Sequence, residues 1–160
     1  MKSVLAHAGH VCWEALVGGS RYRPLTGFLL RYNPHLTMQN FILLTIHTTY
    51  PLSPPVEIYS IDAARYDARG KYITCIDAFE GLTPDDLEEI GTFFGDPTQT
   101  FLVAENPDVA QKLLTAAFRQ ANLPTPAHHI LDPYHFGVPL EWFPRFFVEN
   151  SEQVMKAFER

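Results

Sequence analysis

The chain has 160 residues, a formal net charge of -6 and a pI near 5.6. This length is enough for one domain with a substantial core, and the acidic charge argues against non-specific nucleic-acid binding, which needs clustered Lys and Arg. The two cysteines, Cys12 and Cys75, provide no disulfide framework, and no stretch approaches the roughly 20 apolar residues of a membrane span. We therefore expect a cytoplasmic protein with neither nucleic acid nor membrane among its partners.

The first half of the chain predicts one helix followed by a run of strands. Residues 3–17 carry apolar side chains at helical spacing and are followed by the helix-ending pair Gly18–Gly19. Apolar and β-branched stretches then predict strands at 25–32, 39–50, 56–61 and 71–79. The turn of the last hairpin is expected at 67–70, where Gly70 can adopt the left-handed conformation.

Two capped helices are predicted in the second half. Thr83 is a suitable N-cap and Pro84 suits the first turn of a helix that ends near Gly95. A strand at 100–104 leads directly into a second helix, in which we expect Asn106 to be the N-cap. Its apolar stripe is Ala110, Leu113, Leu114, Ala117, Phe118 and Ala121, and the stripe predicts a buried face.

The C-terminal part begins with an irregular segment at 125–144 that is rich in Pro, His and aromatic residues. A last helix is expected to start at Asn150 or Ser151 and to run through Phe158. Strands in a run followed by helices predict an α+β fold. We expect a single domain over residues 1–160, with an antiparallel or mixed sheet of four to five strands and helices packed mainly on one face.

His7, His10 and Glu14 share one side of the predicted N-terminal helix. Two imidazoles and a carboxylate are plausible ligands for a transition metal. Their spacing extends over two turns, however, and polar side chains belong on the solvent face of an amphipathic helix in any case. The solvated face is therefore the favoured interpretation, and no metal or cofactor is expected.

A second polar group consists of His128, His129, Asp132 and His135, which fall within eight residues of the irregular segment. An imidazole and a carboxylate can act as general base and orienting partner, or as metal ligands. No nucleophile motif such as G-x-S-x-G accompanies them, so structural hydrogen bonding is the favoured role.

Glycine-rich phosphate-binding motifs are absent from the sequence. The turn at 104–108 joins a strand to a helix, which is where many nucleotide sites lie. Two acids and a proline occupy it in place of glycines, so we expect it to repel anions.

The third feature is an aromatic segment in which Pro139 and Pro144 argue against a long helix. Its candidate binding residues are Tyr134, Phe136, Trp142, Phe143, Arg145, Phe146 and Phe147. Aromatic residues and Arg dominate interface hot spots, although aromatic rings are also common in cores. If the segment binds a partner, at least two of Trp142, Phe143, Phe146 and Phe147 should be exposed.

These features favour a non-enzymatic protein-binding module of the inhibitor, immunity or adaptor type. Its expected partner is another protein, with a basic surface that complements the acidic charge. The alternative is a small hydrolase or metal-dependent enzyme that uses His128, His129, Asp132 and His135. A second alternative is a homodimeric structural module that associates through the aromatic segment. The sequence resembles no family closely enough to name one.

Overall fold

The computed structural model describes residues 40–48, 57–76 and 81–158. The helix expected at 3–17, the strand expected at 25–32 and the metal candidates His7, His10 and Glu14 lie outside these residues. No helix within the described ranges is both long enough and apolar enough to cross a membrane.

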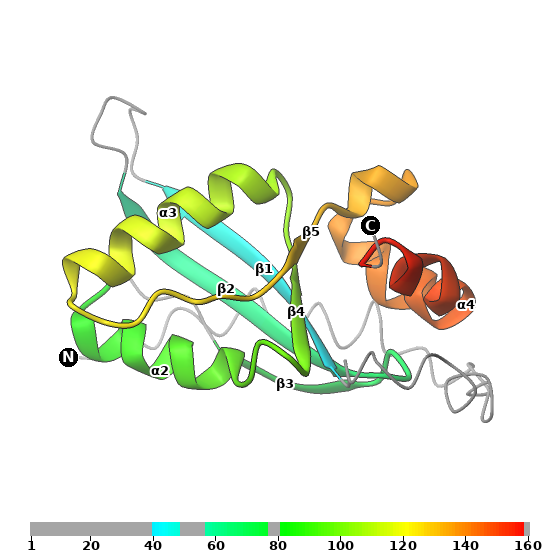
Figure 1. Cartoon of the computed structure of the whole chain (residues 1–160), viewed down its shortest axis with the longest axis horizontal. Coiled ribbons are helices and arrows are strands. Elements are labelled where there is room, and N and C mark those ends of the chain that lie inside the picture. The colour runs from blue at the N-terminus through cyan, green and yellow to red at the C-terminus, as the bar shows by residue number, and fades with distance from the viewer. Residues whose placement is uncertain (1–39, 49–56, 77–80, 159–160) are drawn as a thin grey trace.

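The centre of the fold is one mixed sheet of five strands in the order β3-β2-β1-β4-β5 (Figure 1). The strands are β1 (Asn40–Thr48), β2 (Ile58–Asp67), β3 (Tyr72–Ile76), β4 (Thr100–Val103) and β5 (Ile130–Leu131). β3, β2 and β1 pair antiparallel, whereas β4 pairs parallel to β1 and β5 pairs parallel to β4. The predicted α+β class with a mixed sheet is confirmed.

β1 is the middle strand because both of its faces are apolar. Ile42 and Leu44 enter one hydrophobic cluster, while Phe41 and Leu43 enter another on the opposite face. All four side chains are at most 5% exposed. A strand covered on both faces has a continuous run of apolar residues in its sequence. This run is the reason why the strand could be predicted.

β2 is longer than the strand expected at 56–61, because it continues to Asp67. Residues 62–67 have few strong strand formers, but they pair with β1 in continuous antiparallel register. Tertiary pairing therefore overrides local propensity here. The turn lies where it was expected, and Gly70 has a left-handed φ of 74°.

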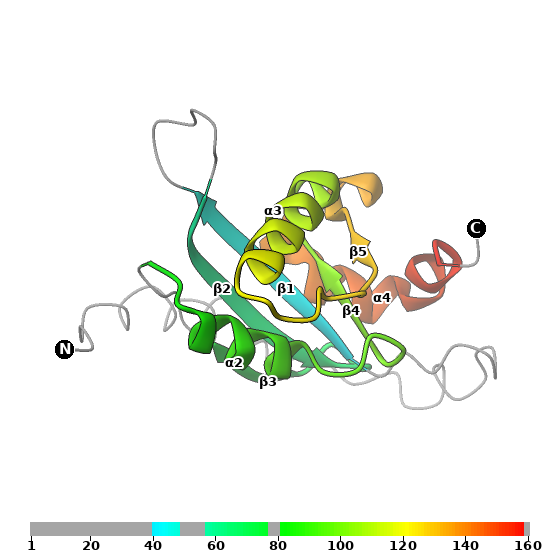
Figure 2. The ribbon, with the colours of Figure 1, turned by 60° about the vertical axis from the view of Figure 1, so that its left-hand side comes forward.

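Helices cover both faces of the sheet (Figures 1 and 2). α2 (Pro84–Phe94) and α3 (Pro107–Gln120) pack on one face, with Ile90, Phe94, Leu114 and Phe118 in the core. α4 (Phe143–Lys156) packs on the other face.

The predicted start of α2 is confirmed. Thr83 Oγ1 accepts a hydrogen bond from the amide of Asp86 at 3.2 Å, and the Thr83 amide donates to Asp86 Oδ2 at 2.9 Å. This reciprocal pair is a capping box that satisfies two amide donors at the helix start. At the other end, Gly95 has a φ of 66° and follows the last turn.

The start of α3 differs from the prediction in its capping. Asn106 occupies the N-cap position, but it is in the left-handed region (φ 50°, ψ 68°) and its side chain makes no capping hydrogen bond. Asn tolerates this conformation better than most residues, which accounts for its presence at a sharp strand-to-helix turn. On the predicted face, Leu114 and Phe118 are buried and Leu113 is half-buried.

The last helix begins earlier than expected. After β5 come two short 3-10 helices, η3 (Pro133–Phe136) and η4 (Leu140–Trp142), and α4 then starts at Phe143 rather than at Asn150 or Ser151. Pro144 does not break the helix, because it lies in the first turn of α4, where no amide donor is needed. Asn150 is non-helical, with φ -133° and ψ 27°, and joins two helical stretches, so the helix start expected at Asn150 or Ser151 coincides with the second stretch.

Candidate functional site

The edge of the sheet where the parallel strands end is a common location for a ligand site. In sheets of this kind, ligands bind outside the carboxyl ends of the parallel strands. β1, β4 and β5 run in the same direction, so their carboxyl ends share one edge. Glu105 lies two residues after the end of β4, Asp132 follows β5, and His47 lies near the end of β1.

The carboxylates near this edge are held in separate hydrogen bonds. Asp62 Oδ2 is 3.0 Å from His47 Nε2, and Glu105 Oε1 accepts from the Tyr134 hydroxyl at 3.2 Å. Asp132 Oδ1 accepts from the backbone amide of Tyr134 at 2.9 Å and caps η3. The hydrogen bond to Glu105, together with the surrounding negative charges, raises the pKa of Tyr134, so its hydroxyl remains a donor.

The described residues do not fit a metal centre. Catalytic sites with two metal ions hold them about 3.5–4 Å apart, and their carboxylate ligands converge on the ions. No group of three or more His, Cys, Asp or Glu in the described ranges is arranged to hold a metal ion.

His128, His129, Asp132 and His135 do not converge into one site. His128 is buried and its Nε2 is 3.1 Å from the carbonyl oxygen of Phe94. The His129 ring lies beside Phe158, and the His135 ring lies beside Phe136. Although these residues are close in sequence, their rings pack against different parts of the fold.

His128 and Arg65 both act at the C-terminal end of α2. Arg65 donates a hydrogen bond to the carbonyl oxygen of Phe93, and its guanidinium lies 5.4 Å from the centre of the Phe93 ring. Burial lowers the pKa of His128, although contacts with the backbone of Phe94 and Gly95 and the charge of Asp96 oppose this shift. Both side chains stabilise the last carbonyls of the helix, so their role is structural.

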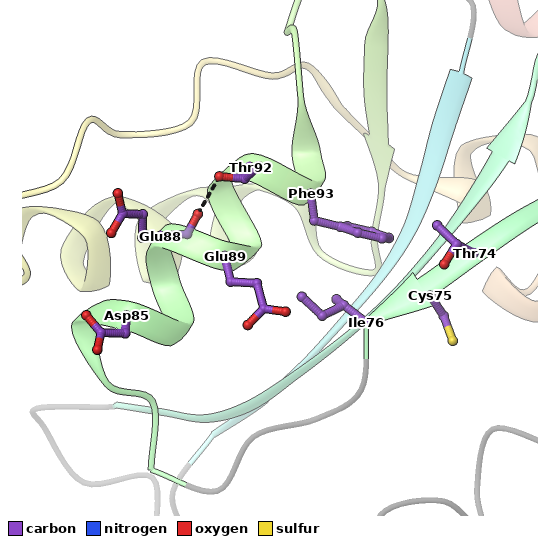
Figure 3. A pocket seen from close by; sticks show the side chains of 8 residues that line it. All are labelled: Thr74, Cys75, Ile76, Asp85, Glu88, Glu89, Thr92 and Phe93. Carbon is purple, nitrogen blue, oxygen red and sulfur yellow. Dashed lines mark hydrogen bonds between the residues drawn. The ribbon is translucent and has the colours of Figure 1, made fainter.

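An open groove of about 540 Å³ lies between α2 and the edge strand β3 (Figure 3). Glu89 and Phe93 point from the helix toward Ile76, whereas Cys75 points to the other side of the strand. Asp85 and Glu88 add two further carboxylates to the lining. The three acids would repel an anionic ligand, so this groove does not suit one.

The aromatic segment is mostly core. Phe143 is 0% exposed and Phe147 is 3% exposed, and both rings pack on Phe41, with centroid distances of 5.5 and 4.8 Å. Phe136 and Phe146 are half-buried and face each other. Among Trp142, Phe143, Phe146 and Phe147, only Trp142 is exposed, so the expectation that at least two of them are exposed is wrong.

Tyr134 and Trp142 are the exposed rings of this segment, at 54% and 53%. Tyr134 is surrounded by acids, because the charges of Glu105, Glu141 and Asp132 all act on its hydroxyl. Trp142 has a different environment, since the guanidinium of Arg145 lies 5.7 Å from the centre of its ring.

The fold brings three exposed basic residues to one place. The β2–β3 turn touches the start of α4 so closely that a β-carbon at Gly70 would overlap Val148 and lie 3.0 Å from the carbonyl oxygen of Pro144. Figures 1 and 2 both place this turn beside α4. Arg69 and Lys71 flank Gly70, and Arg145 follows Pro144, so the backbones of the three basic residues lie around one contact. We call Arg69, Lys71, Arg145 and Trp142 the basic face; all four are exposed.

No family model matches the sequence, and no curated protein matches it. Among solved structures, exonuclease I matches with a TM-score of 0.50 and 13% identity, over 62% of this chain and 29% of that chain. A complex of E. coli exonuclease I with a 5cy-dT13 oligonucleotide matches with a TM-score of 0.48 and 14% identity, over 62% and 29% of the two chains. The Nibbler EXO domain of Aedes aegypti matches with a TM-score of 0.41 and 18% identity, over 63% and 46%. The match to exonuclease I at a TM-score of 0.50 shows a likeness of fold alone, and the chain spans less than a third of exonuclease I.

The likeness to exonuclease I corrects two predictions. The protein-binding inhibitor, immunity or adaptor interpretation is contradicted, and the alternative of a hydrolytic or metal-dependent enzyme agrees better with this fold. The exclusion of nucleic acid is contradicted as well, because the matching fold is that of an exonuclease. That exclusion rested on a net charge summed over the chain, which does not reveal basic residues that the fold gathers on one face.

Proposed function

We propose that this chain is a domain of the exonuclease I fold that binds single-stranded nucleic acid. The observation that carries the proposal is the mixed five-stranded sheet, which matches exonuclease I at a TM-score of 0.50. Matching exonuclease I structures include a complex with ssDNA and a complex with an oligonucleotide.

The distribution of charge supports the proposal. Glu105 and Asp132 lie at the carboxyl edge, and Asp85, Glu88 and Glu89 line the groove beside β3. The basic face gathers its cations at the β2–β3 turn and the start of α4. A phosphate backbone is attracted to exposed Lys and Arg, so a strand has a favourable place to bind despite the acidic total.

Phosphodiester hydrolysis is the second candidate, favoured by the exonuclease fold of the neighbours. A divalent metal would supply an activated water and stabilise the leaving oxygen. Because the described residues do not fit a metal centre, we derive no hydrolytic step from them.

We also propose a cytoplasmic location. The support is the free thiol of Cys75, which a reducing compartment would maintain.

The test is equilibrium binding of a fluorescently labelled oligothymidylate, measured by anisotropy at several salt concentrations. We expect saturable binding whose logarithmic salt dependence has a slope of about -0.7 for each phosphate contacted. A gel of the same samples with added Mg²⁺ or Mn²⁺ reports on hydrolysis. Absence of binding at low salt would overturn the proposal, and metal-dependent cleavage would establish the second candidate.

A further inference from the structure

We propose that the basic face is the surface on which the single strand lies, with one base stacked on Trp142. This inference rests on the proposed function and adds the residues that perform it. Proteins that bind single strands combine a positively charged path for the backbone with aromatic side chains that stack on bases. The basic face brings both parts together.

Trp142 is exposed yet firmly positioned. It ends η4, and the next residue, Phe143, is 0% exposed in the core beneath α4. Pro139 precedes η4 and Pro144 follows Phe143, so the backbone on both sides is restricted. An aromatic ring fixed in this way loses little conformational freedom when a base stacks on it. The guanidinium of Arg145 lies over the ring, 5.7 Å from its centre, and adds positive charge there.

The β2–β3 turn holds its two cations in a defined position. Asp67 Oδ1 accepts from the amide of Arg69 at 2.8 Å and from the amide of Lys71 at 2.9 Å. Between them, Gly70 has a φ of 74° and packs directly against α4. The carboxylate of Asp67 is thus engaged by the backbone, while the Arg69 and Lys71 side chains remain exposed for phosphates.

The other exposed ring of the segment is a poorer platform. Tyr134 lies among Glu105, Asp132 and Glu141, and their charges would repel the phosphates of a strand stacked on it. Glu141 also neighbours Trp142 in sequence, and Glu149 lies further along α4. These two acids limit the number of phosphates that the basic face can contact, which favours a short single strand over a duplex.

The experiment compares variants of the full chain in the oligothymidylate binding assay. Trp142→Ala should weaken binding by roughly 5- to 150-fold, the range that stacking of one base provides, whereas Trp142→Phe should retain most of the affinity. The double variant Arg69→Gln, Lys71→Gln should reduce the salt slope by about 0.7 for each phosphate that the protein no longer neutralises. The matched control is Lys112→Gln, Arg119→Gln, which removes two exposed cations from α3.

The outcomes separate the two proposals. If the wild-type chain binds and the α3 control weakens binding as much as the variants of the basic face, the strand lies elsewhere and this inference is wrong. If Trp142→Ala binds as tightly as the wild type, stacking on Trp142 is refuted while the proposed function stands. If the wild-type chain itself does not bind, both proposals fail. Thermal unfolding of each variant verifies that the fold is retained.

Discussion

Replacing Phe143 by Ala tests whether the start of α4 is core, as the structure shows, or exposed surface. Phe143 is 0% exposed, and its ring meets the Phe41 ring edge-on at 5.5 Å and the Phe147 ring at 6.1 Å. Truncation of a buried Phe to Ala costs about 3–5 kcal/mol, and aromatic pairs add about 0.5–1.5 kcal/mol beyond the buried area. We therefore expect Phe143→Ala to reduce the free energy of unfolding by about 4–5 kcal/mol.

Urea unfolding followed by far-ultraviolet circular dichroism measures this reduction, with Trp142→Ala as the neighbouring control. Because Trp142 is 53% exposed and its ring contacts the Arg145 guanidinium, its truncation should cost about 0.5–1 kcal/mol. For a chain of this size, the destabilisation in Phe143→Ala lowers the thermal midpoint by about 8–20 °C. A cost below about 1 kcal/mol in Phe143→Ala, or equal costs in both variants, would refute the assignment of core and surface.

Three further predictions concern α2, α3 and the loop before β5. Thr83→Ala should lower stability by about 1 kcal/mol through loss of the capping box, and an unchanged urea midpoint would mean that the cap contributes nothing. Leu114→Ala should cost about 2–5 kcal/mol by leaving a cavity, more than the same change at half-buried Leu113; equal costs would contradict the assigned buried face. Burial keeps the pKa of His128 below 6.5, so below that pH the unfolded chain binds a proton that the native chain does not. Stability should therefore be complete above about pH 6.5 and fall as the pH drops toward the folded pKa. In urea unfolding across this range, the free energy of unfolding should depend less on pH in His128→Gln than in the wild type. His129→Gln is the control. An unchanged pH profile in His128→Gln would refute the contribution of His128 to this dependence.

Features decided by neighbouring residues were predictable from the sequence. The start of α2 follows from Thr83, Pro84 and Asp86, which are within reach of one another along the chain. β1 follows from its unbroken apolar run. The start of α4 was missed because Pro144 is compatible with both a loop and a first helical turn, and packing of Phe143 and Phe147 on Phe41 selects the helix.

Features decided by contacts between distant segments were not predictable. The parallel pairing of β1 with β4 skips over β2, β3 and α2, and nothing in the local sequence specifies it. The basic face joins a hairpin turn to a helix near the end of the chain, so Arg69, Lys71 and Arg145 look scattered in the sequence. The polar residues His128, His129, Asp132 and His135 are the opposite case. They are close in sequence, but the fold does not bring their side chains together.

The most direct test of the central claim is the fluorescence of Trp142 during titration with a single-stranded oligonucleotide. The chain has two tryptophans, Trp13 and Trp142, so Trp13→Phe leaves Trp142 as the only indole. If a base stacks on Trp142, its emission should be quenched saturably, with the same midpoint as the anisotropy of the labelled oligonucleotide. Oligonucleotide binding with no change in Trp142 emission, or no binding at all, would contradict the account.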